Sequence, residues 1–201
     1  MKGEVQSAVQ VENPSYRALH RYTKALTIAL GYRDPYTRVH SDRVLALSDA
    51  LGTRAGISGR ELGLLRISAT FHDVGKIGIP DRILLKPAQL DPTETEEMKK
   101  HSELGEFIMI ATELEASEDV ARTIRHHHEN YDGSGYPDGL RGENIPILSR
   151  IIGIADSYDA MAVTRSYRTA RGHREIVEIM SQESGQKHDP DLLRLFFEIV
   201  E

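Results

Sequence analysis

Residues 71–76 place side chains that could bind metal ions and phosphate within five consecutive positions, from His72 to Lys76. The imidazole of His72 could bind a divalent metal, and the two carboxylate oxygens of Asp73 could bridge two metals. Lys76 could contact a phosphate, and Gly75 permits a tight backbone turn at the end of a helix. A single His-Asp pair is weak evidence for a metal site, but the other histidines of the chain strengthen it.

Two groups of residues could each hold one metal ion, with one aspartate shared between them. The first group comes from three predicted helices and consists of His40, His72, Asp73 and Asp156. The second group consists of His101, Asp73 and two of the three histidines 126–128, and spacing alone does not choose which two. Nitrogen and carboxylate ligands without sulfur suit iron, manganese, cobalt, nickel or zinc, and such ions could keep open positions for hydrolysis.

The same residues also have purely structural interpretations. His20, His173 and His188 are expected to be ordinary surface side chains, and the histidine triplet could end a helix in solvent. Asp156 could be a surface acid, but most of its neighbours in 151–155 are apolar. An acid among apolar residues needs a buried partner or a metal, so the conjunction of all these residues favours a metal site.

The composition is that of one globular domain with a substantial core. The chain has 201 residues, of which 39% are hydrophobic and 28% charged, and its net charge is −6. This balance offers no basic face for duplex nucleic acid or an anionic membrane. The absence of cysteine excludes disulfides and thiolate metal ligands. Residues 1–12 lack a signal-peptide pattern and no apolar run approaches the roughly 20 residues of a membrane span, so we expect a cytoplasmic location without membrane attachment.

Apolar residues recur at three- and four-residue steps along most of the chain, which predicts an all-α fold. The predicted helices cover approximately residues 14–30, 35–55, 58–73, 91–114, 117–129, 147–164, 173–182 and 189–200, with a short helical turn through Leu84. We expect a capping box formed by Ser58 and Glu61 at the start of the third helix. We also expect the helix that begins near residue 91 to bend near Gly105.

We expect a flexible segment over residues 1–13, followed by one domain over residues 14–201. Residues 131–146 are irregular and rich in glycine and proline. A loop of this length inside a compact domain usually carries function.

Six motifs occur in a characteristic order along the chain. They are Asp34-Pro35-Tyr36-Thr37, His72-Asp73-Val74-Gly75-Lys76-Ile77-Gly78-Ile79-Pro80, His101, His127-His128-Glu129, Asp132-Gly133-Ser134-Gly135-Tyr136-Pro137 and Ile154-Ala155-Asp156-Ser157-Tyr158-Asp159-Ala160-Met161. On these motifs the sequence resembles an HD-GYP domain, a bacterial branch of the HD phosphohydrolase superfamily, over roughly residues 30–200. The resemblance implies a single HD-superfamily helical bundle of about seven or more helices, with the glycine-rich loop between helices.

The resemblance also implies a metal-dependent phosphodiesterase that hydrolyses cyclic di-GMP to pGpG and, in some members, on to GMP. Two divalent transition metals are implied, with iron or manganese expected, and a hydroxide bridging them would attack phosphorus. The implied metal ligands are His40, His72, Asp73, His101, His127, His128 and Asp156, a set that leaves His126 out. The implied catalytic residues are Asp73, Lys76 and Asp159, and the implied substrate contacts are Lys76, Asp159, Arg165 and Arg168.

The sequence departs from the family pattern at a few positions. Tyr36 stands where some members carry a glutamate associated with a third metal, so we expect two metals. Residues 162–164 and Ala88 also differ from the usual pattern, and they could alter loop shape or substrate preference. None of these departures removes an expected ligand.

Other functions remain open at this point. The chain could prefer cyclic GMP-AMP, hydrolyse a different nucleotide, or use two irons for oxygenation, although the Gly135-Tyr136-Pro137 motif argues against the last two. It could instead be a non-catalytic sensor of cyclic dinucleotides or a protein-interaction module. Degenerate members usually lack ligands, whereas all seven are present here. The Gly-Tyr-Pro loop could also contact a signalling protein alongside catalysis.

Overall fold

The computed structural model describes residues 24–26, 28–163 and 170–201, except for the side chains of residues 35, 36 and 38. Within these ranges the regular structure is helical, and an isolated bridge between Ser184 and His188 is the sole β-type pairing. The all-α prediction is therefore confirmed. The predicted flexible segment 1–13 lies outside the described residues, as does most of the predicted helix 14–30. Its described residues, 24–26 and 28–30, are helical, and the helix continues to residue 33.

The α-helices of the described part are α2 (Pro35–Arg54), α3 (Gly59–Phe71), α4 (Asp81–Leu84), α5 (Pro92–Lys99), α6 (His101–Ile110), α7 (Ser117–Arg125), α8 (Ile147–Ala162), α9 (His173–Gln182) and α10 (Pro190–Val200). Two short 3₁₀ helices, η2 (Val74–Gly78) and η3 (Gly142–Asn144), stand between them. None of the helices in these ranges combines the length and the apolar character needed to cross a membrane.

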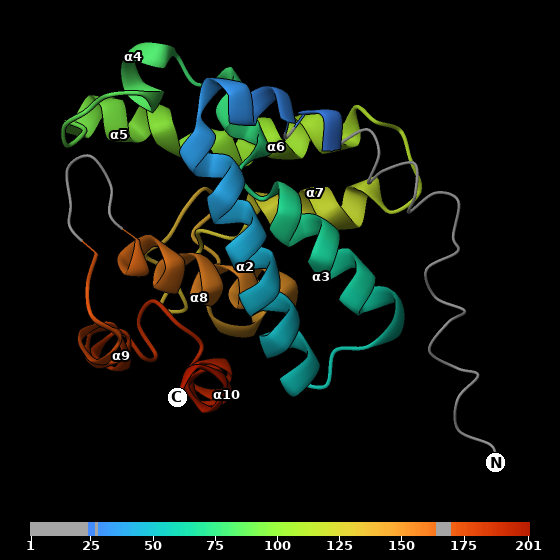
Figure 1. Ribbon diagram of the computed structural model, residues 1–201. Coiled ribbons are helices and arrows are strands. Elements are labelled where there is room, and N and C mark those ends of the chain that lie inside the picture. The colour runs from blue at the N-terminus through green and yellow to red at the C-terminus, as the bar shows by residue number, and fades with distance from the viewer. Residues whose placement is uncertain (1–23, 27, 164–169) are drawn as a thin grey trace.

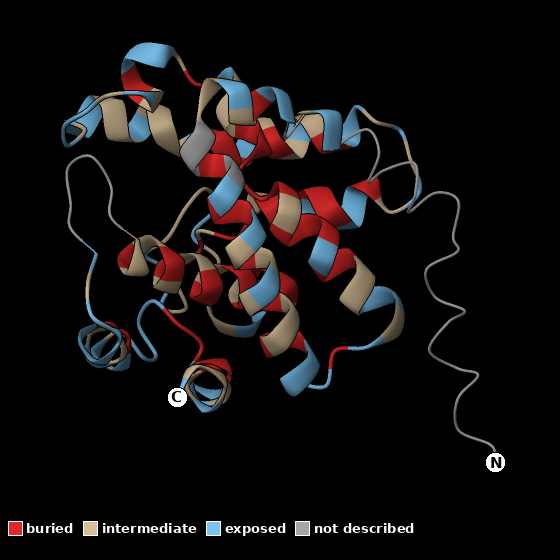
Figure 2. Ribbon diagram, in the orientation of Figure 1, coloured by how far each residue is buried: buried red, intermediate tan, exposed pale blue. Residues whose placement is uncertain are grey.

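Helix α2 runs through the middle of the bundle and contacts the elements on either side of it (Figure 1). It packs against α3, α8 and α10, while α6 packs against α7 and η2. The buried residues gather along the faces where these helices meet (Figure 2). Val44, Leu51, Leu65, Ile124, Ile151 and Phe196 are among the fully buried members of this core. Each such side chain contributes roughly 1.5–3 kcal/mol by leaving water.

Two local predictions are wrong. Ser58 is the N-cap residue of α3, but its side chain makes no capping hydrogen bond, so the capping box is absent there. The predicted helix 91–114 does not bend at Gly105 but breaks at Lys100, between α5 and α6. Gly105 instead allows close packing, because a Cβ there would lie 2.8 Å from a methyl carbon of Ile124.

Gly75 determines how closely η2 can approach α6. A Cβ on Gly75 would lie 1.9 Å from the carbonyl oxygen of His101 and 2.5 Å from the amide nitrogen of Gly105. Both neighbours are backbone atoms and cannot rotate away. Gly75 is therefore needed for this backbone contact, which brings the segment after α3 against the first turn of α6.

We predict that Gly75→Ala will lower the free energy of unfolding by about 3 kcal/mol or more, because the added methyl group must push η2 away from α6. Urea unfolding followed by circular dichroism measures this change. Gly172→Ala is a matched control, since a Cβ at Gly172 would meet nothing within 4 Å. Equal stability of the two variants would show that this backbone contact is not needed.

Candidate metal centre

The seven expected metal ligands meet where five segments of the chain converge. They are His40 on α2, His72 and Asp73 just after α3, His101 at the start of α6, His127 and His128 just after α7, and Asp156 on α8. Five of them are at most 3% exposed, while His128 and Asp156 are partly exposed. Such burial of imidazoles and carboxylates together, with one side still open, suits a metal centre that admits a substrate.

The first group of ligand atoms has the spacing of a coordination shell. The Nε2 atom of His40 lies 3.0 Å from Oδ1 of Asp156 and 3.3 Å from Nε2 of His72. The Oδ2 atom of Asp73 lies 3.5 Å from Nε2 of His72 and 3.8 Å from Nε2 of His40. With metal–ligand bonds of about 2.1 Å, neighbouring ligand atoms are separated by roughly 3.0–3.5 Å, so these residues fit a divalent transition metal.

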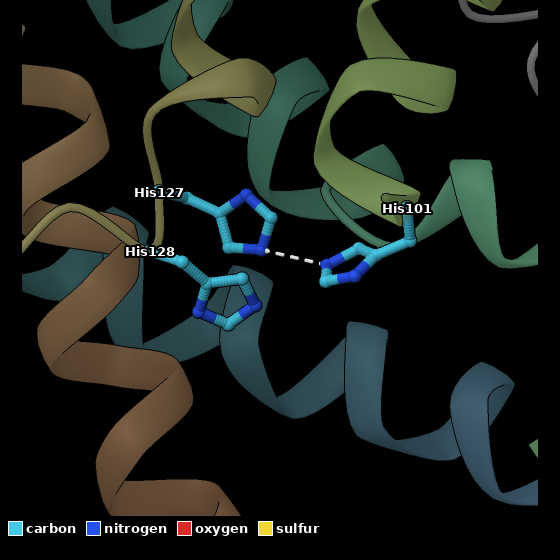
Figure 3. Close-up of side chains that lie close together, drawn as sticks. All are labelled: His101, His127 and His128. Carbon is cyan, nitrogen blue, oxygen red and sulfur yellow. Dashed lines mark hydrogen bonds between the residues drawn. The ribbon is translucent and has the colours of Figure 1, made fainter. Parts of the chain in front are cut away.

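The second group consists of three histidines and the other oxygen of Asp73. The Nε2 atoms of His101 and His127 lie 3.5 Å apart, and the rings of His127 and His128 lie side by side (Figure 3). Ring nitrogens of these three histidines lie within 4.8 Å of one another. The Oδ1 atom of Asp73 lies 3.6 Å from Nε2 of His101. Asp73 thus offers one oxygen to each group, the arrangement needed to bridge two metals.

Hydrogen bonds hold four of the five ligand histidines through the nitrogen that faces away from the centre. In His72, His101 and His127 the Nδ1 atom pairs with the backbone carbonyl three residues earlier, at 2.8, 2.8 and 2.5 Å. In His40 the Nδ1 atom pairs with Oδ2 of Asp159 at 2.6 Å. Each bond leaves Nε2 available to a metal, as is usual for metal-binding histidines.

Asp159 lies behind His40 and is itself held by an arginine. Arg43 approaches its carboxylate with Nε 2.5 Å from Oδ1 and Nη2 2.9 Å from Oδ2. Asp159 is only 2% exposed, and both of its oxygens accept these bonds. The direct substrate contact expected for Asp159 stays a prediction, while the observed contacts favour a role in orienting His40.

The charge balance of the metal-free centre is set by buried groups. Burial alone would lower the pKa of His40, but hydrogen bonds to Asp156 and Asp159 raise it to about 9. Burial lowers the pKa values of His72, His101 and His128, and it lowers the pKa of His127 to about 3. Four of the five imidazoles are therefore neutral and ready to bind metal near pH 7, whereas His40 carries a proton.

Both carboxylates of the centre remain ionised despite their burial. Desolvation alone would raise the pKa of Asp73, but the charge of Lys76 and the electrostatic interaction with the surrounding imidazoles hold it well below its ordinary value. The pKa of Asp156 is held well below its ordinary value in the same way, through its hydrogen bond with His40. The expected phosphate contact Lys76 donates to Oδ2 of Asp73 at 2.6 Å. Lys76 thus places a positive charge directly beside Asp73.

Other expected residues fall outside this centre. Arg165 and Arg168 lie outside the described residues. His126 points away, because its Nδ1 pairs with the carbonyl of Arg122 and its Nε2 lies 2.8 Å from Asp138, which agrees with leaving it out of the ligand set.

The three histidines interpreted as surface residues differ among themselves. His173 is exposed and lies 2.9 Å from the hydroxyl of Tyr158. His188 is only 3% exposed and its Nε2 lies 3.2 Å from Glu183, so its interpretation as a surface side chain is wrong. His20 lies outside the described residues.

Sequence reasoning missed Arg43. It lies three residues after His40 on α2, close to the same face of the helix, and this spacing was the one signal that could have indicated it.

Comparisons with known proteins identify the family of the chain. The family model of the HD domain matches residues 24–192. A cyclic di-GMP phosphodiesterase of Thermotoga maritima is 38% identical over 184 residues, which cover 90% of this chain and 49% of that protein. A 3′3′-cGAMP-specific phosphodiesterase of Vibrio cholerae is 36% identical, covering 86% of this chain and 33% of that protein. The chain thus spans half or less of the length of these curated relatives.

A solved structure supports the fold. An HDG"Y"P protein from Bdellovibrio bacteriovorus superimposes with a TM-score of 0.69 at 20% identity, covering 94% of this chain and 66% of that one. At this level of identity the likeness concerns the fold alone. The family match over most of the chain, together with the order of the sequence motifs, shows that the chain belongs to the HD domain family, in its HD-GYP branch.

Proposed function

We propose that this chain is a phosphodiesterase that hydrolyses cyclic dinucleotides, with cyclic di-GMP the preferred substrate and pGpG the first product, continuing in part to GMP. Two divalent ions, iron or manganese, would be held by the seven ligands. The observation that carries the proposal is the position of Asp73, whose two oxygens face different groups of ligand atoms. A shared carboxylate between two ions 3.5–4 Å apart is typical of sites that cleave phosphate esters.

The relatives support the same substrate class. The Thermotoga maritima relative is named a cyclic di-GMP phosphodiesterase, and the Vibrio cholerae relative is named as specific for 3′3′-cGAMP. Because both names occur among proteins of similar identity, preference for cyclic GMP-AMP is the second candidate.

Two bound ions would supply an activated water and neutralise charge on the phosphate as it is attacked. The chain's own residues prepare the site for this chemistry. The carboxylate of Asp73 lies between the two groups of ligand atoms, and the buried imidazoles direct neutral nitrogens toward the centre. Lys76 would stabilise the charge that develops on a non-bridging phosphate oxygen. Arg165 and Arg168 are proposed to hold the second phosphate of the substrate.

A non-catalytic sensor is less well supported. A protein that only binds the nucleotide has no need of seven converging ligands, four of them held through Nδ1 by hydrogen bonds. A cavity of about 380 Å³ beside His127 and His128 is of the size used for small molecules. A signalling protein that contacts the loop of residues 131–146 would meet its exposed positions, which are Asp132, Ser134, Asp138, Gly139, Arg141, Glu143 and Asn144.

We predict that the chain, reconstituted without oxygen with iron(II) or manganese(II), will convert cyclic di-GMP to pGpG. Asp73→Ala should lower kcat by roughly 10³-fold or more, because the bridge between the two ions is lost. Separation of pGpG from GMP by chromatography measures both turnover and the extent of the second hydrolysis. Cyclic GMP-AMP in a parallel reaction tests the second candidate.

Arg66→Gln is a suitable control for the Asp73 variant, since Arg66 pairs with Asp49 in an exposed ion pair away from the centre. Near-normal turnover by Asp73→Ala would overturn the assignment of the site. Absence of turnover on either dinucleotide, with two ions bound, would favour the sensor.

We predict that metal binding at pH 7.5 releases about one proton per chain. The pKa of His40 is about 9 in the metal-free protein, so its proton must leave before Nε2 can bind an ion. The other four imidazoles are already neutral. Below pH 9 the proton competes with the metal, and the apparent affinity should therefore rise roughly tenfold per pH unit between pH 7 and pH 9.

Calorimetric titration with manganese(II) in two buffers of different ionisation enthalpy counts the released protons. His40→Gln should lower the number of released protons by about one. An affinity independent of pH in this range would contradict the charge assignment of His40.

A further inference from the structure

His128 is held differently from the other expected ligand histidines. Those four are anchored through Nδ1, three by a backbone carbonyl and one by Asp159. Among the described residues, neither ring nitrogen of His128 has a hydrogen-bond partner. A metal-binding histidine almost always donates its second ring N–H to an acceptor, which fixes the ring for the metal. Something other than a hydrogen bond must therefore fix the ring of His128.

Aromatic rings surround His128. The ring of Tyr136 stacks on it with centroids 4.9 Å apart and an angle of 29° between the planes. The ring of His127 lies next to it at 3.9 Å, and His101 meets it edge-on at 5.0 Å (Figure 3). His101 and His127 are themselves expected ligands. Tyr136 is thus the ring partner of His128 that comes from outside the ligand set.

The backbone around Tyr136 is pressed against the segment that carries His128. The amide of Tyr136 donates to the carbonyl oxygen of His128 at 3.2 Å. A Cβ on Gly135 would lie 2.2 Å from the amide nitrogen of Asn130 and 2.5 Å from Cα of Glu129. Because Gly135 has no side chain, the loop can approach this segment closely enough for the ring of Tyr136 to cover the imidazole of His128.

Charged groups hold the far side of the loop. The carboxylate of Glu129, which is 7% exposed, accepts the backbone amides of Asp138 at 2.7 Å and Leu140 at 3.1 Å. The carboxylate of Asp138 accepts hydrogen bonds from Arg125 at 2.7 and 2.8 Å and lies 2.8 Å from Nε2 of His126. These contacts tie the residues after Tyr136 to the end of α7, so the ring of Tyr136 has little freedom to move away.

We propose that Tyr136 is a positioning residue for His128, whose stacked ring supplies the orientation that the other ligand histidines obtain from a hydrogen bond. This inference rests on the metal centre proposed above. The tyrosine of the Gly-Tyr-Pro segment then belongs to the inside of the site. Its aromatic face, and not its hydroxyl, makes the contact that orients His128. Its loss should weaken the second metal group and leave the first group, around His40 and His72, intact.

The test compares Tyr136→Leu, which removes the ring, with Tyr136→Phe, which keeps it. Tyr131→Leu makes the same change at the start of the same loop and is the matched control. Equilibrium dialysis against manganese(II) gives the number of bound ions and their dissociation constants. Tyr136→Leu should bind one of two ions about 10–100-fold more weakly, whereas Tyr136→Phe and Tyr131→Leu should bind both like the original chain.

A second readout needs no metal. In the metal-free protein, the carbon-bound ring protons of His128, assigned from a His128→Gln variant, should be shifted upfield by the stacked ring of Tyr136. Tyr136→Leu should remove this shift and Tyr136→Phe should retain it. If the chain binds no metal, the proposed centre fails, but this measurement still reports whether Tyr136 positions His128.

Unchanged binding of both ions by Tyr136→Leu, with His128 resonances unmoved, would overturn the inference. Loss of binding by Tyr136→Phe to the same degree as by Tyr136→Leu would also overturn it, since the hydroxyl would then be the important group.

Discussion

The structure depends on keeping the carboxylate of Asp73 ionised while it is 3% exposed. Burying an unpaired carboxylate costs several kcal/mol, so positive charge must lie close to it. In the metal-free chain that charge comes from Lys76, 2.6 Å from Oδ2, and from the protonated ring of His40, whose Nε2 lies 3.8 Å from the same oxygen. Divalent ions would replace both. The site is therefore a buried anionic pocket balanced by nearby cations, which is the electrostatic basis of the metal binding proposed above.

The fold serves this constraint through close backbone contacts. Gly75 allows η2 to lie against the start of α6, and this brings Asp73 within 3.6 Å of His101. The break at Lys100 places His101 at the first position of α6, where its Nδ1 still reaches a carbonyl three residues back. Three of the expected ligands, His72, His101 and His127, lie at helix ends, where the backbone carbonyl three residues earlier accepts a hydrogen bond from their Nδ1 atoms.

Most of the fold could be predicted from the sequence, because helices depend on local patterns, whereas the ligand set followed from the family resemblance and stays a prediction. Apolar periodicity indicated the helices, and His173–Gln182 has the predicted bounds. The break at Lys100 was not predictable, because it depends on the packing of α6 against η2 and α7. The burial of His188 was missed for the same reason, since local composition does not show what covers a side chain. Two further contacts could not be predicted, those between Arg43 and Asp159 and between Tyr136 and His128. Both are tertiary contacts, and the spacing of residues along the chain does not define such contacts.

The central claim, that two ions share Asp73, is tested most directly by anomalous X-ray diffraction from crystals loaded with manganese(II). The account predicts two anomalous peaks, one beside His40 and His72 and one beside His101, His127 and His128. Asp73 should lie between them with one oxygen on each, and Lys76 should have left Asp73. A single peak, or none with Lys76 still bonded to Asp73, would contradict the account.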